Sequence, residues 1–466
     1  MKNKVFIVLL IPITCLAEPP AKPPGSAPNS NTNISYNGKT VINSDKIFEN
    51  KTFTSSSNSE IALLITDGKS TINSCTITKK GSEGSETSDF YGTNAAVLVK
   101  KGTLNINDST VITTGSYANA VFSYDKGIIN INNSNIETNL NNSGGVMVTG
   151  GGILNATNVK VKTTGNSSAA IRSDRGGGEL NVKKGSYETT GKGSPTIYST
   201  AAITVEESNL KSTSSEGIVI EGNNSVKLKN TKIEDTNETL NGNSETYKNI
   251  FLYQSMSGDA NEGESIFTSE NSEIITNKGD TFYITNTKAN ISLINNKFTN
   301  KDGDFLRIEK SKWGNQGSNG GDVTLDTNNQ DINGNILVDS ISSLTFNLKE
   351  KSFFKGSINN ENKASKLELT LSKDSIVILT KDSYLSKLNN EDSSNQNIYL
   401  NGNKLYVDGK EVQGNKGKYK EIKKQEKKEE KKSISSKHLI ALLGVIALII
   451  IILSVLITVI KRNRRR

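Results

Sequence analysis

Apolar residues return along the middle of the chain roughly every 25 residues, and each opens a short stretch with the alternation of a β-strand. These repeat starts are Val97, Val121, Val146, Ile171, Ile197, Ile218, Ile250, Phe282 and Phe305. A repeat of this length, made of short strands and Asn- and Gly-rich turns, is typical of stacked parallel β-helices. The pattern therefore predicts an all-β fold, a right-handed parallel β-helix over residues 34–412, with the repeat starts facing inward.

A second apolar pattern lies inside each repeat, where short segments that begin with glycine align with one another. Gly102-Thr-Leu-Asn-Ile-Asn107 and Gly127-Ile-Ile-Asn-Ile-Asn132 are two of them. Two inward columns follow from the alignment: Leu104, Ile129, Leu154 and Leu180, and Ile106, Ile131, Ala156 and Val182. Because a strand this short cannot bury a face alone, we expect equivalent positions to stack into one continuous core.

Side chains alternate along a strand, so the residues one and three places after each inward start are expected to face outward. The first outward column is Leu98, Phe122, Met147, Arg172, Tyr198, Val219, Phe251, Tyr283 and Leu306. The second is Lys100, Tyr124, Thr149, Asp174, Thr200, Glu221, Tyr253, Thr285 and Ile308. Soluble surfaces seldom carry so apolar a stripe without a function, and outward rings are expected to add little to the core.

The stripe predicts a ligand-binding face, because ladders of aromatic rings suit the apolar faces and polar edges of sugars. Its predicted ligand-binding residues are Phe122, Tyr124, Arg172, Asp174, Tyr198, Phe251, Tyr253 and Tyr283. Two other interpretations stay open: long inserts cover these residues, or a slip of one residue reverses the parity in some repeats. The inserts span 236–248, 257–265 and 312–321, and the last contains Trp313, the only tryptophan.

The amino-acid composition excludes several classes of function. Only 33% of the residues are hydrophobic, and much of the net charge of +8 lies near the C-terminus, so the body lacks the basic surface that nucleic-acid binding requires. The single histidine, His438, excludes histidine catalysis and histidine-ligated zinc from the body. Of the two cysteines, Cys15 and Cys75, only Cys75 remains after processing, so no internal disulfide is expected. We expect no metal and no cofactor.

The two ends of the chain predict export and anchoring. Residues 1–17 have the basic start, apolar stretch and small residues of a signal peptide, although cleavage before Cys15 as a lipoprotein is an alternative. A proline-rich spacer covers 18–33, and a charged Lys/Glu linker covers 413–437. Residues 438–460 are apolar enough for a transmembrane helix, and the basic tail 461–466 follows. We expect a single-pass cell-membrane protein with its body extracellular and its C-terminus cytoplasmic.

Several longer segments carry a resemblance to known proteins. They are Ile171-Arg-Ser-Asp-Arg-Gly-Gly-Gly178, Gly193-Ser-Pro-Thr-Ile-Tyr-Ser-Thr200, Leu252-Tyr-Gln-Ser-Met-Ser-Gly-Asp-Ala260, Trp313-Gly-Asn-Gln-Gly-Ser-Asn-Gly-Gly-Asp322 and Asp339-Ser-Ile-Ser-Ser-Leu-Thr-Phe346. Together they resemble adhesin-like, right-handed parallel β-helix surface proteins, which are close in architecture to the pectin-lyase-like superfamily. The resemblance implies fold and surface location. It carries no catalytic signature over to this chain.

Three functions remain open. The first is adhesion or capture of an extracellular polysaccharide, a glycoconjugate or another cell surface through the aromatic stripe. The second is a polysaccharide hydrolase or lyase that uses Asp174 and Glu221, two strand spacings or about 10 Å apart, close to the separation of inverting glycosidases. In a competing interpretation Asp174 pairs with an arginine and fixes a turn. The third is a passive stalk with no ligand.

Overall fold

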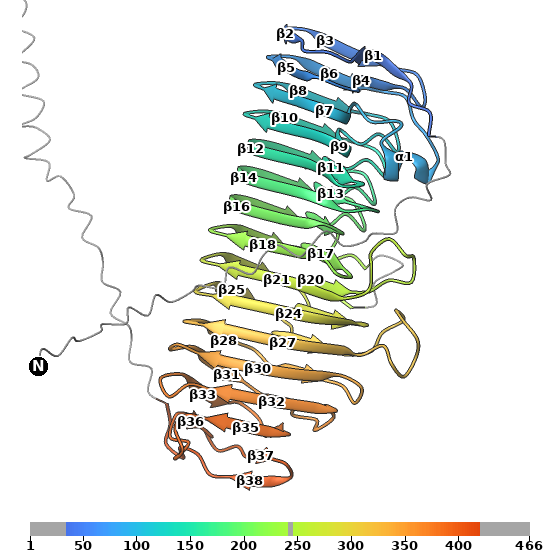
Figure 1. Cartoon of the computed structure of the whole chain (residues 1–466). Coiled ribbons are helices and arrows are strands. Elements are labelled where there is room, and N and C mark those ends of the chain that lie inside the picture. Colours follow the sequence, from blue (N-terminus) through green and yellow to red (C-terminus); the bar gives the residue numbers. More distant parts are fainter. Residues whose placement is uncertain (1–33, 241–245, 420–466) are drawn as a thin grey trace, which may run out of the picture. The chain divides into compact units, whose positions relative to one another are not determined.

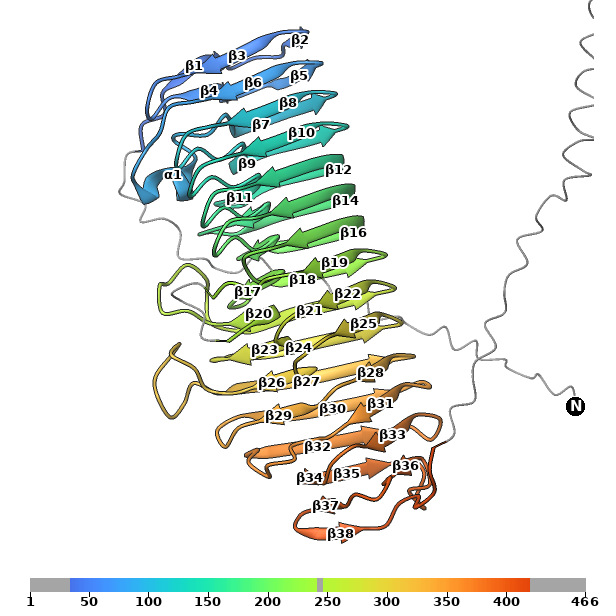
Figure 2. The same ribbon diagram turned by 180° about the vertical axis from the view of Figure 1, so that it is seen from behind.

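The computed structural model describes residues 34–240 and 246–419, and within them the chain forms a parallel β-solenoid of about 15 turns. The predicted signal peptide, proline-rich spacer, membrane span and basic tail lie outside these ranges, as does most of the predicted 413–437 linker. Strands run from Gly38 to Val412 and stack turn upon turn (Figures 1 and 2). No helix within the two described ranges has the length and apolar character needed to cross a bilayer.

Three series of strands make the three faces of the solenoid. The first is β1 (Gly38–Ile42), β4 (Ile61–Ile65), the starts of β7 (Val97–Asn107) and β9 (Val121–Asn132), β11 (Val146–Thr149), β13 (Ile171–Ser173), β15 (Ile197–Ser199), β17 (Ile218–Glu221), β20 (Lys248–Tyr253), β23 (Asp280–Thr285), β26 (Leu306–Ile308) and β29 (Ile336–Val338). We call the surface of this series the first face.

The second series continues each turn: β2 (Ile47–Glu49), β5 (Lys69–Asn73), the later parts of β7 and β9, the starts of β12 (Gly152–Thr163), β14 (Gly178–Thr189) and β16 (Ala202–Ser212), then β18 (Ser225–Lys229), β21 (Glu264–Glu270), β24 (Thr287–Ile294), β27 (Gly321–Asn328), β30 (Ser343–Lys349), β32 (Lys366–Leu371) and β35 (Lys387–Asn390).

The third series closes each turn: β3 (Thr52–Ser55), β6 (Thr76–Lys79), β8 (Thr110–Thr113), β10 (Asn135–Thr138), the ends of β12, β14 and β16, then β19 (Lys232–Asp235), β22 (Glu273–Thr276), β25 (Lys297–Asn300), β28 (Asp331–Asn333), β31 (Phe353–Gly356), β33 (Ile376–Leu379) and β36 (Ile398–Tyr399). At the C-terminal end β34 (Ser383–Leu385) pairs with β37 (Leu405–Val407). Strand β38 (Lys410–Val412) then pairs antiparallel with β37 and covers that edge.

The two inward columns predicted from the sequence are confirmed. Leu104, Ile129, Leu154 and Leu180 are direct partners in neighbouring strands, as are Ile106, Ile131, Ala156 and Val182. All eight side chains are almost fully buried in one core that runs the length of the solenoid. Alternation along each strand explains this arrangement, because every second residue points inward and stacks on its counterpart.

A ladder of polar side chains also lies inside the turns, at the corner between the second and third series. Asp108 and Asn133 adopt left-handed backbone conformations at this corner, with φ near 50°. The next residue then turns inward: Cys75 donates its N–H to Ser109 Oγ at 3.0 Å, and Ser109 donates its N–H to Ser134 Oγ at 3.1 Å. The hydroxyls satisfy backbone groups that the bend would otherwise leave unpaired.

The predicted parity is wrong in one repeat. The residue opposite Phe282 is Leu306, not Phe305, and Leu306 is fully buried in the core with the other repeat starts. The two outward positions of this repeat therefore belong to Arg307 and Glu309, and Ile308 is also in the core. Phe305 and Leu306 are both apolar, so the local pattern fits either register, and the strand pairing decides between them.

Candidate functional site

The first face carries two separate groups of apolar side chains, and the N-terminal group is covered. Leu98, Phe122 and Met147 are fully buried beneath a segment that includes α1 (Glu86–Tyr91). Gly92 ends this helix with a left-handed φ of 71°, and a Cβ on it would stand only 3.0 Å from the ring of Phe122. Phe122 is therefore not a ligand-binding residue, because a cover that is distant in sequence shields it from solvent.

Tyr124 lies at the edge of the same covered group. Its ring centroid is 5.8 Å from that of Tyr91 in α1 and 6.3 Å from that of Tyr36. Tyr124 is half-buried and packs against this covered group. The outward residues in this part of the solenoid are therefore covered, but by the segment that contains α1 and not by the inserts 236–248, 257–265 or 312–321.

The C-terminal group contains five aromatic residues and one valine packed together, and we call it the aromatic cluster: Tyr198, Val219, Phe251, Tyr253, Tyr283 and Trp313. The rings of Phe251 and Tyr253 stack with centroids 4.5 Å apart, and Tyr283 lies 5.8 Å from Phe251. Phe251, Tyr253 and Tyr283 are only 8%, 7% and 5% exposed. The expectation that these outward rings add little to stability is therefore wrong, because they bury one another.

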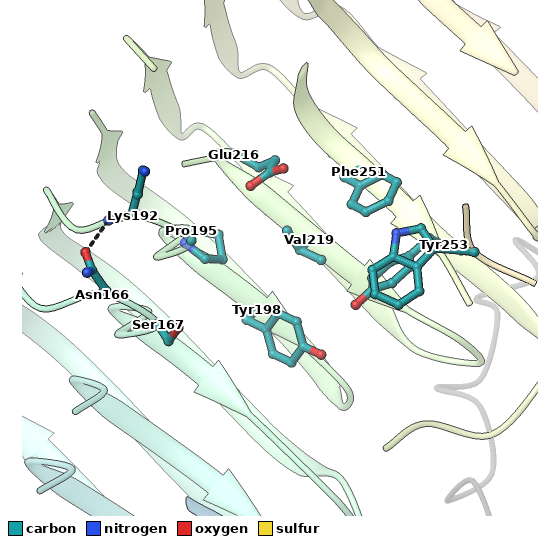
Figure 3. A pocket seen from close by; sticks show the side chains of 11 residues that line it. Asn166, Ser167, Lys192, Pro195, Tyr198, Glu216, Val219, Phe251 and Tyr253 are labelled. Atoms are coloured by element: carbon teal, nitrogen blue, oxygen red, sulfur yellow. Dashed lines mark hydrogen bonds between the residues drawn. The ribbon is translucent and has the colours of Figure 1, made fainter. Parts of the chain in front are cut away.

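One edge of the aromatic cluster opens into a cavity of about 410 Å3, which we call the first cavity (Figure 3). Its lining comprises Asn166, Ser167, Lys192, Gly193, Pro195, Tyr198, Glu216, Val219, Phe251, Tyr253 and Trp313. The volume falls within the range of about 300–1,000 Å3 typical of small-molecule sites. The rings of Tyr198, Phe251 and Tyr253 lie toward one side of the first cavity, and Asn166, Ser167 and Lys192 lie toward the other (Figure 3).

A buried ion pair borders the first cavity, because Glu216 is one of the lining residues. Lys248 Nζ is 3.4 Å from Glu216 Oε1, and the same ammonium lies 4.6 Å from the ring centroid of Phe251 and 5.3 Å from that of Tyr283. Asp235 is close by, and burial raises its pKa to about 8. Since the Lys248 ammonium is paired with Glu216 and also lies over the two rings, it helps to hold these rings in position.

The insert between β26 and β27 supplies Trp313, whose ring centroid lies 5.2 Å from that of Tyr253. The buried Asn319 side chain holds the loop by donating to the carbonyl oxygens of Ser311 at 2.7 Å and of Trp313 at 2.8 Å. The backbone of this loop is therefore held by the Asn319 amide and not by the indole of Trp313. The indole itself is half-buried and forms part of the wall of the first cavity.

Glu221 is fully buried and accepts hydrogen bonds from the hydroxyls of Tyr198, Ser255 and Tyr253, the last at 3.0 Å. Burial raises the pKa of this carboxyl, although the three donors oppose the shift. The carboxylate gathers residues of three segments around itself. Its role in the structure is therefore to position the aromatic cluster.

Asp174 is also sequestered. Its Oδ2 lies 2.9 Å from Arg172, which also pairs with Asp89 of α1 at 3.2 Å. Burial raises the pKa of Asp174 to about 7, despite the opposing effect of the guanidinium. The neighbouring Arg175 pairs with Asp259 at 2.5 Å. The predicted pairing of Asp174 with an arginine at this turn is confirmed, and Arg172 ties the α1 cover to the first face.

The structure places neither Asp174 nor Glu221 in the lining of the first cavity. Both carboxyls are engaged by protein donors, Asp174 by Arg172 and Glu221 by three hydroxyls. Within 34–240 and 246–419 no cluster of three acidic, histidine or cysteine side chains is arranged to hold a metal ion.

The sequence predicted a role for Tyr198, Phe251, Tyr253 and the insert with Trp313, and in the structure these residues lie together. The sequence did not indicate Pro195, Glu216 or Lys248, which lie in turns or at a strand start. Lys248 is the first residue of β20 and stands two residues before the repeat start Ile250. Nothing in the neighbouring sequence indicates that a lysine at this position is buried. Only the stacking of turns places these residues beside the rings.

Comparison with known proteins gives no further guidance: no family model, no curated protein and no solved structure matches the chain. The fold and the site together define a class, a parallel β-solenoid with an aromatic-lined cavity on its first face.

Proposed function

We propose that this protein captures an extracellular glycan through the first cavity, as a non-enzymatic, adhesin-like surface protein. The observation that carries the proposal is a ligand-sized cavity whose wall contains Tyr198, Phe251, Tyr253 and Trp313. Aromatic faces stack on pyranose rings, while Asn166 and Lys192 on the opposite side offer donors and acceptors to hydroxyls.

The proposal includes location. The apolar segment 438–460 would anchor the right-handed solenoid at the cell membrane, and the signal peptide 1–17 would place it outside the cell. The partner would be a polysaccharide, a glycoconjugate or the surface of another cell. Asp174 and Glu221 would serve the architecture, so the hydrolase or lyase alternative has weaker support. A passive stalk would not require a cavity lined with rings.

A glycan panel tests the proposal. Full-length protein is assayed for retention of neutral and acidic glycans and for release of cleaved products. We expect retention without cleavage, and we expect Trp313→Ala to weaken it at least tenfold, as for an aromatic hot spot worth about 2 kcal/mol. Because Asn319 holds the loop, this variant should stay folded.

Tyr406→Ala is the matched control. Tyr406 is half-buried and stacks on Tyr384 with ring centroids 4.9 Å apart, but it does not line the first cavity. It should bind as wild type does. If the wild type and Trp313→Ala retain glycans equally, the first cavity is not the binding site. Release of cleaved products would favour the hydrolase or lyase alternative.

A further inference from the structure

A second and larger cavity adjoins the first. Its volume is about 800 Å3, and it lies between the insert that follows β20 and the insert that follows β26. Both inserts project from the same side of the solenoid (Figures 1 and 2). We call this space the second cavity.

Consecutive residues line the two cavities at two places. Tyr253 lines the first cavity and the next residue, Gln254, lines the second; likewise Trp313 lines the first and Gly314 the second. The half-buried indole of Trp313 is therefore part of the boundary between them. A chain that leaves the first cavity over this ring would enter the second.

The cavities together follow the solenoid axis. The first begins at Asn166 and Ser167, in the turn before β13, and the second ends at Ser343, the first residue of β30. Strands β13, β15, β17, β20, β23, β26 and β29 are successive neighbours, so the turns that line the two cavities extend across six strand spacings, or about 29 Å. That is the length of several linked sugar rings, not of one.

The linings differ in kind. Rings dominate the first cavity, whereas polar side chains, among them the amides of Asn286 and Asn315 and the hydroxyl of Ser318, predominate in the lining of the second. Amides and hydroxyls both donate and accept hydrogen bonds, which matches the vicinal hydroxyls of a sugar. The aromatic side chains of the first cavity would stack on a sugar ring, and the polar side chains of the second cavity would hydrogen-bond to the sugars that follow it in the ligand.

The charges balance over both cavities. The linings contain two lysines, Lys192 and Lys288, and two carboxyl residues, Glu262 and Asp322, while the third carboxyl residue, Glu216, is paired with Lys248. A surface with no excess of either sign gives no electrostatic advantage to a polyanion or a polycation. An uncharged polymer fits this lining best.

We propose that the ligand is an uncharged, linear polysaccharide that lies along the solenoid axis and occupies both cavities across Trp313. This inference rests on the proposed function and adds the class of the ligand, its direction and its minimum length. Neither cavity alone would account for the full affinity, because linked subsites raise it through effective concentration.

Oligosaccharide ladders test the inference. Full-length protein is titrated by calorimetry with cello-, chito- and manno-oligosaccharides from disaccharide to octasaccharide. For a ladder that binds, affinity should rise at least about tenfold with length. Ser318→Phe places a ring in the second cavity, since Ser318 is exposed there and its hydroxyl bonds only within its own turn. It should reduce octasaccharide affinity to that of the disaccharide and leave the disaccharide unaffected.

Ser56→Phe, an exposed serine remote from both cavities, is the control and should change neither affinity. Equal affinity for disaccharide and octasaccharide, or an octasaccharide unaffected by Ser318→Phe, would overturn the two-cavity site while the proposed function stands. Binding of polyuronate or sulfated chains in place of the neutral ladders would overturn the uncharged class. No binding of any glycan would overturn both proposals.

Discussion

The rings of Phe251 and Tyr253 stack 4.5 Å apart and within 14° of parallel, on the outer surface of one strand. Two residues of the same strand face outward together because side chains alternate. With Tyr283 and Trp313 around them, the two rings are more than nine-tenths buried. The same residues therefore stabilise the first face and form a wall of the first cavity.

Removal of one stacked ring should destabilise the protein. Phe251→Ala leaves a space between Tyr253, Tyr283 and Lys248, and we expect a loss of about 3–5 kcal/mol in the free energy of unfolding. Urea unfolding of the wild type and the variant measures it. Trp313→Ala, at the half-buried edge of the aromatic cluster, should lower the free energy of unfolding clearly less. If Phe251→Ala is as stable as the wild type, the rings behave as surface residues and the prediction is wrong.

Two neighbouring residues test the inward parity of the core. Ile129 points into the solenoid and is fully buried, whereas Ile128 points outward and is half-buried. Ile129→Asp buries a charge without a partner and should prevent folding of the surrounding turns. Ile128→Asp should fold. Circular dichroism and thermal melts separate the two, and the reverse order of stability would contradict the observed register.

The buried carboxyl of Asp235 predicts a pH dependence of stability. Burial raises its pKa from an ordinary value near 3.8 to about 8 in the folded protein. Between these two values the folded protein holds a proton that the unfolded chain has released. The contribution of Asp235 is therefore fully present below about pH 4 and is lost as the pH rises to about 8.

Asp235→Asn isolates this contribution, since the amide oxygen can still accept the N–H of Asn237, which now lies 2.8 Å from the carboxyl. Urea midpoints across that pH window should fall more steeply for the wild type than for Asp235→Asn. Parallel curves for the two proteins would show that Asp235 titrates equally in the folded and unfolded states.

Arg172 should be essential for the α1 cover. It pairs with both Asp89 and Asp174, and all three side chains are largely buried. Arg172→Met leaves two buried carboxyls uncompensated, and we expect a loss of about 3–5 kcal/mol. Lys183→Met removes an exposed lysine that pairs with Glu206 and Glu207 and should leave the unfolding midpoint unchanged. Equal effects of the two substitutions would contradict the assigned role of Arg172.

The regular parts of the fold were predictable from the sequence because the period is visible. The columns of Leu104 and Ile106 follow from the alignment of glycine-led segments, and the burial of Val97 to Phe282 as repeat starts follows from the same spacing. The insert with Trp313 was also recognisable as an irregular, glycine-rich interruption. These features depend on local pattern and repetition.

The burial of Phe122 and the choice between Phe305 and Leu306 as the inward residue could not be predicted from the sequence. Phe122 and Tyr198 occupy equivalent outward positions, yet only Phe122 lies beneath α1, and no residue near Phe122 in sequence announces that contact. Phe305 and Leu306 fit the inward position equally well by hydrophobicity. In both cases a long-range contact decides the outcome, and a single sequence contains no trace of it.

The fluorescence of Trp313 tests the central claim most directly, because this residue is the only tryptophan in the chain and it lines the first cavity. The full-length protein is titrated with the glycan that it retains, and the emission is followed. The account predicts a saturable change in intensity or wavelength at the same concentrations that saturate binding. A glycan that binds to saturation and leaves the emission of Trp313 unchanged would contradict it.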